Sequence, residues 1–277
     1  MSFLAIVLIL WFEKFSALRP RIQHDAWFSR VISALQQGSW AALPSLALAL
    51  LVLLPLLLLA LVLHLADSVF YGLLVLPIDV LVLLYSLGRG DLLSLLGPFR
   101  DAWRRSDAQG ALHVAERDLA LEAREGVALL EQVQGYVLWQ AFQSFFVVIF
   151  WYLLLGPLLA LAYRLLALAA EQSQFAGIAS RAQVLRHALE WLPVRVLSFT
   201  FALVGDFVAV SRALLHEMLS WDITASQVVA KAGRAAADLP EPIYGPAGVE
   251  TLDQLWQLLL RAAVVWYVAA ALWVLFG

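Results

Sequence analysis

The sequence has no cysteine, only five histidines and a net charge of −3. Without cysteine the chain can form no disulfide and has no thiolate to bind a metal. The histidines match no metal-ligand spacing such as H-E-x-x-H, so we expect neither a metal site nor a cofactor. Glycine-rich phosphate loops and G-x-S-x-G elbows are also absent. No clustered basic surface is indicated, so a nucleic-acid partner is not expected.

Apolar residues take the place of charged ones. Of 277 residues, 63% are hydrophobic and 14% are charged, whereas an ordinary soluble domain is about half apolar and about a quarter charged. A membrane-spanning helix needs roughly 20 apolar residues, so the chain has room for about five or six membrane-spanning segments. The long apolar runs, without the alternation of barrel strands, predict an all-α fold: a polytopic membrane helical bundle with an extramembrane helical segment. The lipid bilayer is therefore an expected partner.

The distribution of apolar and charged residues divides the chain into three regions. Residues 1–88 and 136–277 are the N-terminal and C-terminal membrane regions. Membrane segments are expected at about 2–13, 41–65, 69–88, 136–170, 194–215 and 255–276. Residues 89–135 are charged, with apolar residues at helical spacing, which predicts an amphipathic helical segment outside the membrane. Residues 216–254 include a stretch rich in proline and glycine and are expected to form a loop.

The apolar segment at 136–170 is too long for one level span, and Gly156-Pro157 interrupts it. It forms either one long, kinked helix or a broken pair that enters the membrane and returns. Loops rich in lysine and arginine favour the cytoplasmic side. The loop after the first apolar segment has one lysine and three arginines, and residues 89–135 have six arginines, so both are expected in the cytoplasm. Residues 171–195, with three arginines, lie on this side only if the preceding segment returns.

Of the charged residues inside apolar segments, where each charge costs about 3 kcal/mol at mid-bilayer, four are singled out. They are Asp79, Arg164, Asp206 and Arg261. Arg164 and Arg261 either serve a polar path or extend from near a helix end to the membrane interface. Asp79 lies near the middle of its segment and cannot reach the interface well. It is either paired with an arginine or acts as an acid that handles a proton or a ligand.

Two further groups of polar residues are candidates for binding. Gln140, Gln143 and Ser144 share one helix face, where such side chains either join neighbouring helices or line a polar site. Arg117 and Asp118 belong to the charged segment, and a solvated helix face is the simplest explanation for them.

The stretch "HALEWLPVRVLSFTF", residues 187–201, precedes a new apolar run. Trp191 suits a membrane interface, Pro193 is acceptable in the first turn of a helix, and Arg195 can reach lipid headgroups. We interpret the stretch as a structural entry point into the membrane. The alternative is that Arg195 binds an anionic ligand.

Several stretches carry a resemblance to known membrane proteins. In chain order they are "GDLLSLLGPFRDAWRRSDAQGALHVAERD", "FWYLLLGPLLALAYRLL", "HALEWLPVRVLSF" and "GPAGVETLDQLWQLLLRAAVVW". From about residue 89 onward they resemble the CobD/CbiB family of cobalamin biosynthesis, the adenosylcobinamide-phosphate synthases. The opening "LAIVLILWFEKF" and the core "EWLPVRV" are more similar to AmpE, a related family of inner-membrane regulatory proteins of β-lactamase induction.

The departures from the CobD/CbiB pattern affect the groups that carry its chemistry. Members of that family couple an aminopropanol unit to a corrinoid carboxylate and carry H-P-V, E-N-x-x-D-G and S-P-N elements. Here "HDAWFSR" surrounds His24, the residues Trp139, Gln140, Gln143 and Ser144 replace the second element, and "SWDITASQ" replaces the third. The parts retained are Arg117-Asp118, "AYR" ending at Arg164, and Pro193-Val194-Arg195.

The resemblance implies a non-enzymatic sensor or regulator of the bacterial inner (cytoplasmic) membrane, crossing it several times. It would act in the cell-wall-damage response to β-lactams, linked to a cytosolic anhydromuropeptide amidase, with a muropeptide-like or lipid ligand. Assembly into a homo-oligomer is compatible with the sequence. The alternatives are a residual amide-forming enzyme of the CobD/CbiB kind and a transporter of small solutes or muropeptides. No catalytic residue is assigned, and the candidates for ligand binding are Asp79, Arg117, Asp118, Gln140, Gln143, Arg164 and Arg195.

Overall fold

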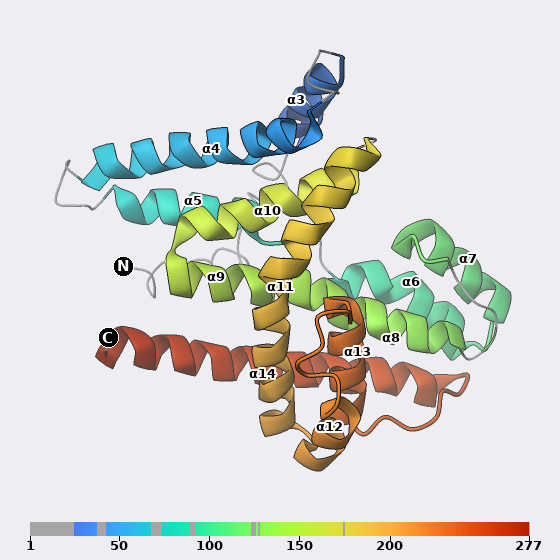
Figure 1. Ribbon diagram of the computed structural model, residues 1–277. Coiled ribbons are helices and arrows are strands. Elements are labelled where there is room, and N and C mark those ends of the chain that lie inside the picture. Colours follow the sequence, from blue (N-terminus) through green and yellow to red (C-terminus); the bar gives the residue numbers. More distant parts are fainter. Residues whose placement is uncertain are drawn as a thin grey trace. The chain divides into compact units, whose positions relative to one another are not determined.

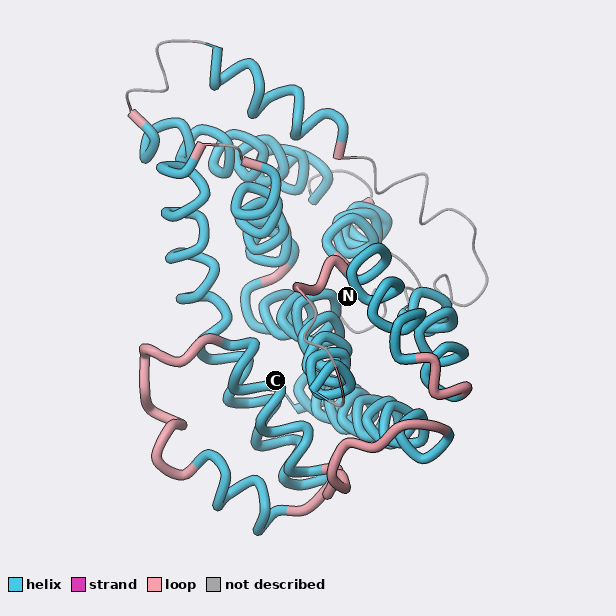
Figure 2. The backbone as a smooth tube through the Cα atoms, turned by 90° about the vertical axis from the view of Figure 1, so that its right-hand side faces the viewer, coloured by secondary structure: helices cyan, strands magenta, loops and turns pink. Residues whose placement is uncertain are grey.

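The computed structural model describes residues 25–37, 43–67, 74–88, 92–122, 126, 128–173 and 175–276. The segment expected at 2–13 and His24 lie outside these residues. Within them the secondary structure is helical and contains no strand, which confirms the all-α prediction (Figures 1 and 2).

The helices follow one another along the chain. In chain order they are α3 (Ala26–Gln37), α4 (Pro44–Asp67), α5 (Val75–Ser86), α6 (Leu92–Arg104), α7 (Ala108–Leu119), α8 (Ala128–Ala141), a π-helical turn (Phe142–Phe146), α9 (Val147–Leu155), α10 (Pro157–Gln172), α11 (Ala176–Val204), α12 (Phe207–Leu214), α13 (Ala225–Ala236) and α14 (Pro246–Phe276). They form two compact units. The first holds α3, α4, α5, α9, α10 and residues 176–190 of α11, and the second holds most of the remainder.

Among the described residues, four helical stretches are long and apolar enough to cross a membrane: Pro44–Asp67, Ala128–Leu155, Ala176–Val204 and Pro246–Leu272. The shorter α5 is apolar as well. The outer face of α4 is made of exposed leucines, and Leu57 is 69% exposed. A continuous apolar face of this kind would drive association in water, whereas in a membrane the acyl chains of the lipids cover it. The protein is therefore a helical membrane protein, as the composition predicted.

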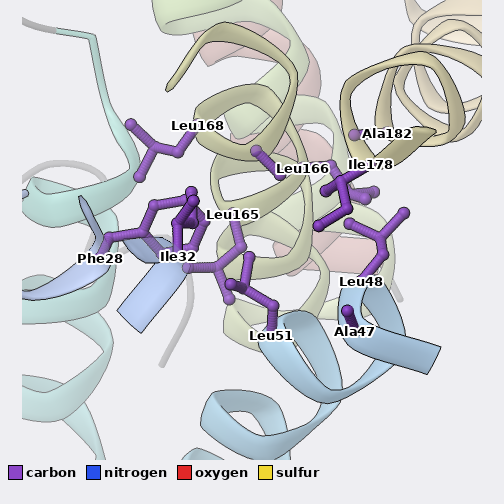
Figure 3. Packing of buried hydrophobic residues seen from close by; sticks show 11 residues of the cluster. Phe28, Ile32, Ala47, Leu48, Leu51, Leu165, Leu166, Leu168, Ile178 and Ala182 are labelled. Atoms are coloured by element: carbon purple, nitrogen blue, oxygen red, sulfur yellow. The ribbon is translucent and has the colours of Figure 1, made fainter. Parts of the chain in front are cut away.

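The core of the first unit is built around α10, which packs against α4, α5 and α9. Figure 3 shows the cluster of buried apolar residues that joins α3, α4, α10 and the start of α11. Its members are Phe28, Ile32, Ala47, Leu48, Leu51, Leu165, Leu166, Leu168, Ala169, Ile178 and Ala182. Because α10 is buried on several sides, polar residues on it must find partners inside the unit.

The apolar segment expected at 136–170 is a broken pair of helices. The break is at Gly156, whose φ of 79° is accessible mainly to glycine, and Pro157 then stands in the first turn of α10. Helices α9 and α10 pack against each other. The continuous helical stretch that ends with α9 begins earlier than expected, with α8 at Ala128, because Leu129, Leu130 and Val133 are buried.

Two boundaries in the C-terminal region were predicted wrongly. Helix α11 begins at Ala176 rather than near 194, so Pro193 lies inside the helix and not in its first turn. The loop expected over 216–254 contains α13 and the start of α14. Helix α13 begins with a capping box in which Thr224 and Gln227 satisfy each other's backbone N–H groups. The three prolines of this segment, Pro240, Pro242 and Pro246, all follow α13.

The second unit packs α13 against α8. Gly233 allows this approach, because a Cβ there would lie 2.6 Å from the side chain of Leu138. A buried hydrogen bond of 2.8 Å from Gln134 to Thr251 joins α8 to α14. Helix α11 ends at Val204, and a Cβ on the following Gly205 would lie 2.3 Å from the carbonyl oxygen of Ala236. A turn then leads into α12.

Candidate functional site

Charged and polar side chains gather inside the first unit, on both sides of α10. We call this group the buried charged cluster. It consists of Asp25, Tyr85, Tyr163, Arg164, Glu171, Gln172, Arg186 and Glu190. Three carboxylates and two guanidinium groups therefore share a largely apolar unit. Such charges are stable there only when they are paired.

The half of the cluster that faces α11 is tightly bonded. Arg186 and Glu190 are one helical turn apart, and Nε of Arg186 donates to Oε1 of Glu190 over 2.7 Å. The phenol of Tyr163 donates to the same oxygen over 2.9 Å. Arg186 also donates to Glu171 over 3.0 Å. Glu190 is only 4% exposed, so its charge depends on the guanidinium and the phenol.

The other half, around Asp25, is held by longer contacts. Nη2 of Arg164 lies 3.6 Å from Oδ2 of Asp25, and Gln172 donates to the same oxygen over 3.3 Å. Tyr85 donates to Oδ1 of Asp25 over 3.4 Å. Among the described residues, the buried atoms Nε of Arg164 and Oε1 of Gln172 have no hydrogen-bond partner. Unsatisfied buried polar atoms are rare in proteins, so this half has unused capacity for a polar ligand.

The sequence singled out only Arg164 from this cluster. We expected it either to reach the interface or to serve a polar path, and the structure buries it beside Asp25. Glu190 and Arg186 were missed because α11 was expected to begin after them. Their spacing of four residues on one helix face was a usable signal. Asp25 gave no signal, since its partner Gln172 is 147 residues away in the sequence.

Asp79 lies on α5 and is also buried, but its partner is a tyrosine rather than an arginine. Tyr152 donates to its Oδ2 over 3.0 Å. Within the described part of the chain, the buried Oδ1 has no hydrogen-bond partner. The carboxyl group thus links α5 to α9 through Oδ2, and Oδ1 could still accept a hydrogen bond.

A proline inside α11 has a specific compensation in the first unit. Pro193 has no N–H, so the carbonyl of Leu189, one turn earlier, loses its usual helical donor. The indole of Trp151 donates to this carbonyl over 3.0 Å. The bond explains how a helix continues through "EWLPVRV" and why the expected helix start at Pro193 was wrong.

Arg195 is only 8% exposed and does not extend toward solvent. Its guanidinium donates to the carbonyl of Trp191 over 2.6 Å and to that of Ser220 over 2.6 Å, and Nε donates to the carbonyl of Met218. It also lies over the Trp191 ring, 3.8 Å from the centroid. Arg195 therefore ties the chain after α12 to α11, which is a structural role.

We expect Arg195→Ala to loosen the segment around Met218 to Ser220 without unfolding the bundle. The variant loses hydrogen bonds from a charged donor, which favours local opening by about tenfold or more. Limited proteolysis with chymotrypsin, followed by mass spectrometry, measures the cleavage rate beside Leu219 and Trp221. Arg212→Ala removes an exposed arginine from the neighbouring α12 and is the matched control. Equal cleavage rates in the two variants would contradict the structural role.

Arg117 and Asp118 form a forked pair at the end of α7, with N–O distances of 2.7 and 2.8 Å. Arg117 is largely exposed. The hydrogen bonds from Arg117 lower the pKa of Asp118, so the carboxylate is ionised at neutral pH. The pair lies on an exposed helix surface and adds little to stability.

Gln140, Gln143 and Ser144 lie at the junction of α8 and the π-helical turn. Gln140 donates to the hydroxyl of Tyr136 over 3.0 Å and accepts from Gln143, while Ser144 donates to the Gln140 carbonyl. These bonds run along one helix rather than between helices. π-Helical turns inside α-helices are frequent at functional sites, so the glutamines remain candidates.

The structure divides the predicted site residues between the two units. Asp79 and Arg164 belong to the first unit, and Arg117, Asp118, Gln140, Gln143 and Arg195 belong to the second. Over the described ranges, no three His, Asp or Glu side chains form a group that could hold a metal ion. The buried charged cluster is thus the strongest candidate site within one unit.

One comparison with known proteins gave a match. No curated protein and no solved structure matches the chain. The model of one protein family, described as regulatory signalling modulator protein AmpE, matches residues 1–277. The chain belongs to the AmpE family of regulatory signalling modulator proteins.

Proposed function

We propose that the protein is a non-enzymatic sensor or regulator of the bacterial inner membrane, acting in the cell-wall-damage response that induces β-lactamase. Membership of a regulatory signalling family supports the regulatory part of the proposal. The sensing part of the proposal rests on two buried atoms of the buried charged cluster, Nε of Arg164 and Oε1 of Gln172, which have no hydrogen-bond partner among the described residues. A regulator needs an element that a ligand can bias between two states.

The cluster has the properties of such an element. Its α11 half is closed by short bonds, whereas its Asp25 half has longer contacts and unused donors and acceptors. A muropeptide-like ligand carries carboxylate and amide groups, and Arg164 and Gln172 supply the complementary donor and acceptor. Binding there would strengthen the Asp25 half and change how α3, α5 and α10 are held together.

The absence of enzymatic activity is part of the proposal. Of the residues retained from the CobD/CbiB pattern, Arg195 donates to backbone carbonyls and Arg117 is paired with Asp118. Arg195 is thus held by structural bonds and Arg117 is paired with its neighbour, which favours a regulator over a residual ligase. A functional link to a cytosolic anhydromuropeptide amidase belongs to the same proposal.

Complementation of a deletion strain tests the proposal. The host is a bacterium with an inducible β-lactamase, and the measured quantity is β-lactamase activity with and without a sub-inhibitory β-lactam. We expect Arg164→Gln to assemble in the membrane and fail to restore the wild-type response. Arg261→Gln is the control, because Arg261 is an exposed arginine on the apolar α14.

Full restoration by Arg164→Gln would contradict the role of the cluster. An unchanged response in the deletion strain would contradict the link to β-lactamase induction. Turnover of a nucleotide or of a corrinoid amidation substrate by the purified protein would overturn the non-enzymatic assignment.

A further inference from the structure

A groove of about 480 Å³ lies on the first unit between α4, α10 and α11. Helix α4 lines it with Leu48, Val52 and Leu53, and α11 lines it with Arg181 and Val184. Its volume is within the range of about 300 to 1,000 Å³ that is common for small-molecule sites. None of these residues belongs to the buried charged cluster.

The groove is apolar and opens onto the apolar surface of α4. Leu53 and Val184 are 54% and 65% exposed, and the leucine face of α4 continues beyond the groove. Such a surface is covered by acyl chains in a membrane. The apolar part of an occupant is therefore an acyl chain.

One end of the groove favours an anion. Arg181 is exposed, and no other described residue forms a hydrogen bond or ion pair with it. The first turns of α4 and α11 meet here, because a Cβ on Gly177 would lie 3.3 Å from Pro44. Figure 3 shows Ile178 and Ala182 of α11 beside Ala47 and Leu48 of α4. Helix N-termini carry partial positive charge, which adds to the charge of the arginine.

The length of α4 places this end at the depth of the lipid headgroups. The helix has 24 residues, and about 20 are needed to cross the hydrocarbon core. When α4 crosses a membrane, its first turn and Arg181 are at the edge of the core, and the next two turns are at acyl-chain depth. The arginine lies at the headgroup end and the apolar groove extends from it, which is the order of the phosphate and the acyl chain in a phospholipid.

We propose that this groove binds an anionic phospholipid, with the phosphate on Arg181 and one acyl chain along Leu48, Val52 and Leu53. Neither Arg181 nor the groove enters the proposed regulatory function, so the two proposals stand or fall separately. The bound lipid would fill the space between α4 and α11 and hold their first turns together.

Native mass spectrometry of the detergent-purified protein tests this inference. The probes are a phosphatidylglycerol and a phosphatidylethanolamine with identical acyl chains. We expect the wild type to retain phosphatidylglycerol preferentially, and Arg181→Ala to weaken that binding about fivefold, the effect of one cation near a lipid headgroup. Val184→Trp, which fills the groove from an exposed position, should remove the preferential adduct.

Arg212→Ala is the control, because Arg212 is an exposed arginine outside the groove and outside the first unit. Circular dichroism verifies that each variant is folded. Equal retention of the two lipids by the wild type would overturn the inference. So would phosphatidylglycerol binding in Arg181→Ala that equals binding in Arg212→Ala.

Discussion

Replacing Glu190 with alanine is expected to lower the free energy of unfolding by about 3 to 5 kcal/mol, which is typical for breaking a buried ion pair from one side. In the variant the guanidinium of Arg186 stays largely buried and loses Glu190 as a partner. Its ion pair with the carboxylate of Glu171 remains. The variant also removes the acceptor of the Tyr163 hydroxyl. The loss of partners at the buried Tyr163 hydroxyl and Arg186 guanidinium, rather than the lost bond itself, accounts for most of the cost.

The apparent melting temperature in detergent, followed by tryptophan fluorescence, measures this effect. We expect a decrease of roughly 10 °C. Glu171→Ala is the matched control, because it removes the other carboxylate bonded to Arg186 from a side chain that is 51% exposed. Its expected cost is about 1 kcal/mol or less, since water replaces the carboxylate there.

A second variant separates pairing from packing. Arg186→Met combined with Glu190→Leu removes both charges and keeps apolar volume. Buried ion pairs replaced in this way are often neutral or stabilising. The double variant should therefore melt above Glu190→Ala. A double variant that melts as low as Glu190→Ala would show that the pair is not the cause.

The second large effect is expected at Trp151. Trp151→Phe keeps an aromatic ring but removes the N–H that serves the carbonyl of Leu189. Leaving a buried acceptor without a donor costs about 1 to 3 kcal/mol. The change in apparent melting temperature of the purified protein measures it.

Pro193→Ala provides the internal control. Alanine at this position restores a backbone N–H one turn after Leu189, so that the helix itself can satisfy the carbonyl. The cost of Trp151→Phe should then shrink in the Pro193→Ala background. Such a double-mutant cycle isolates the coupling between the two positions. An identical cost in both backgrounds would rule out the compensation.

The parts of the fold that the sequence predicts are those that local composition determines. The apolar run expected at 41–65 is α4 at Pro44–Asp67, because 24 residues without an internal charge favour a membrane helix in any context. The break at Gly156-Pro157 was also visible, because glycine and proline act locally on the backbone.

The candidate site was only partly predictable, because its members are joined by long-range contacts. Arg164 and Asp79 stood out as charges among apolar residues, but their partners did not. Tyr152 is 73 residues from Asp79, and Tyr163 is 27 residues from Glu190. The start of α11 was misplaced for a related reason: the effect of Pro193 depends on a donor from α9, which no local pattern reveals.

The hydrogen bond between Trp151 and the Leu189 carbonyl also predicts how sequences vary within the AmpE family. A chain with proline at position 193 requires a donor at position 151, and tryptophan supplies one. A relative without that proline closes its own helical bond and is free to carry leucine or phenylalanine at 151. Positions 151 and 193 are thus expected to change together rather than one at a time.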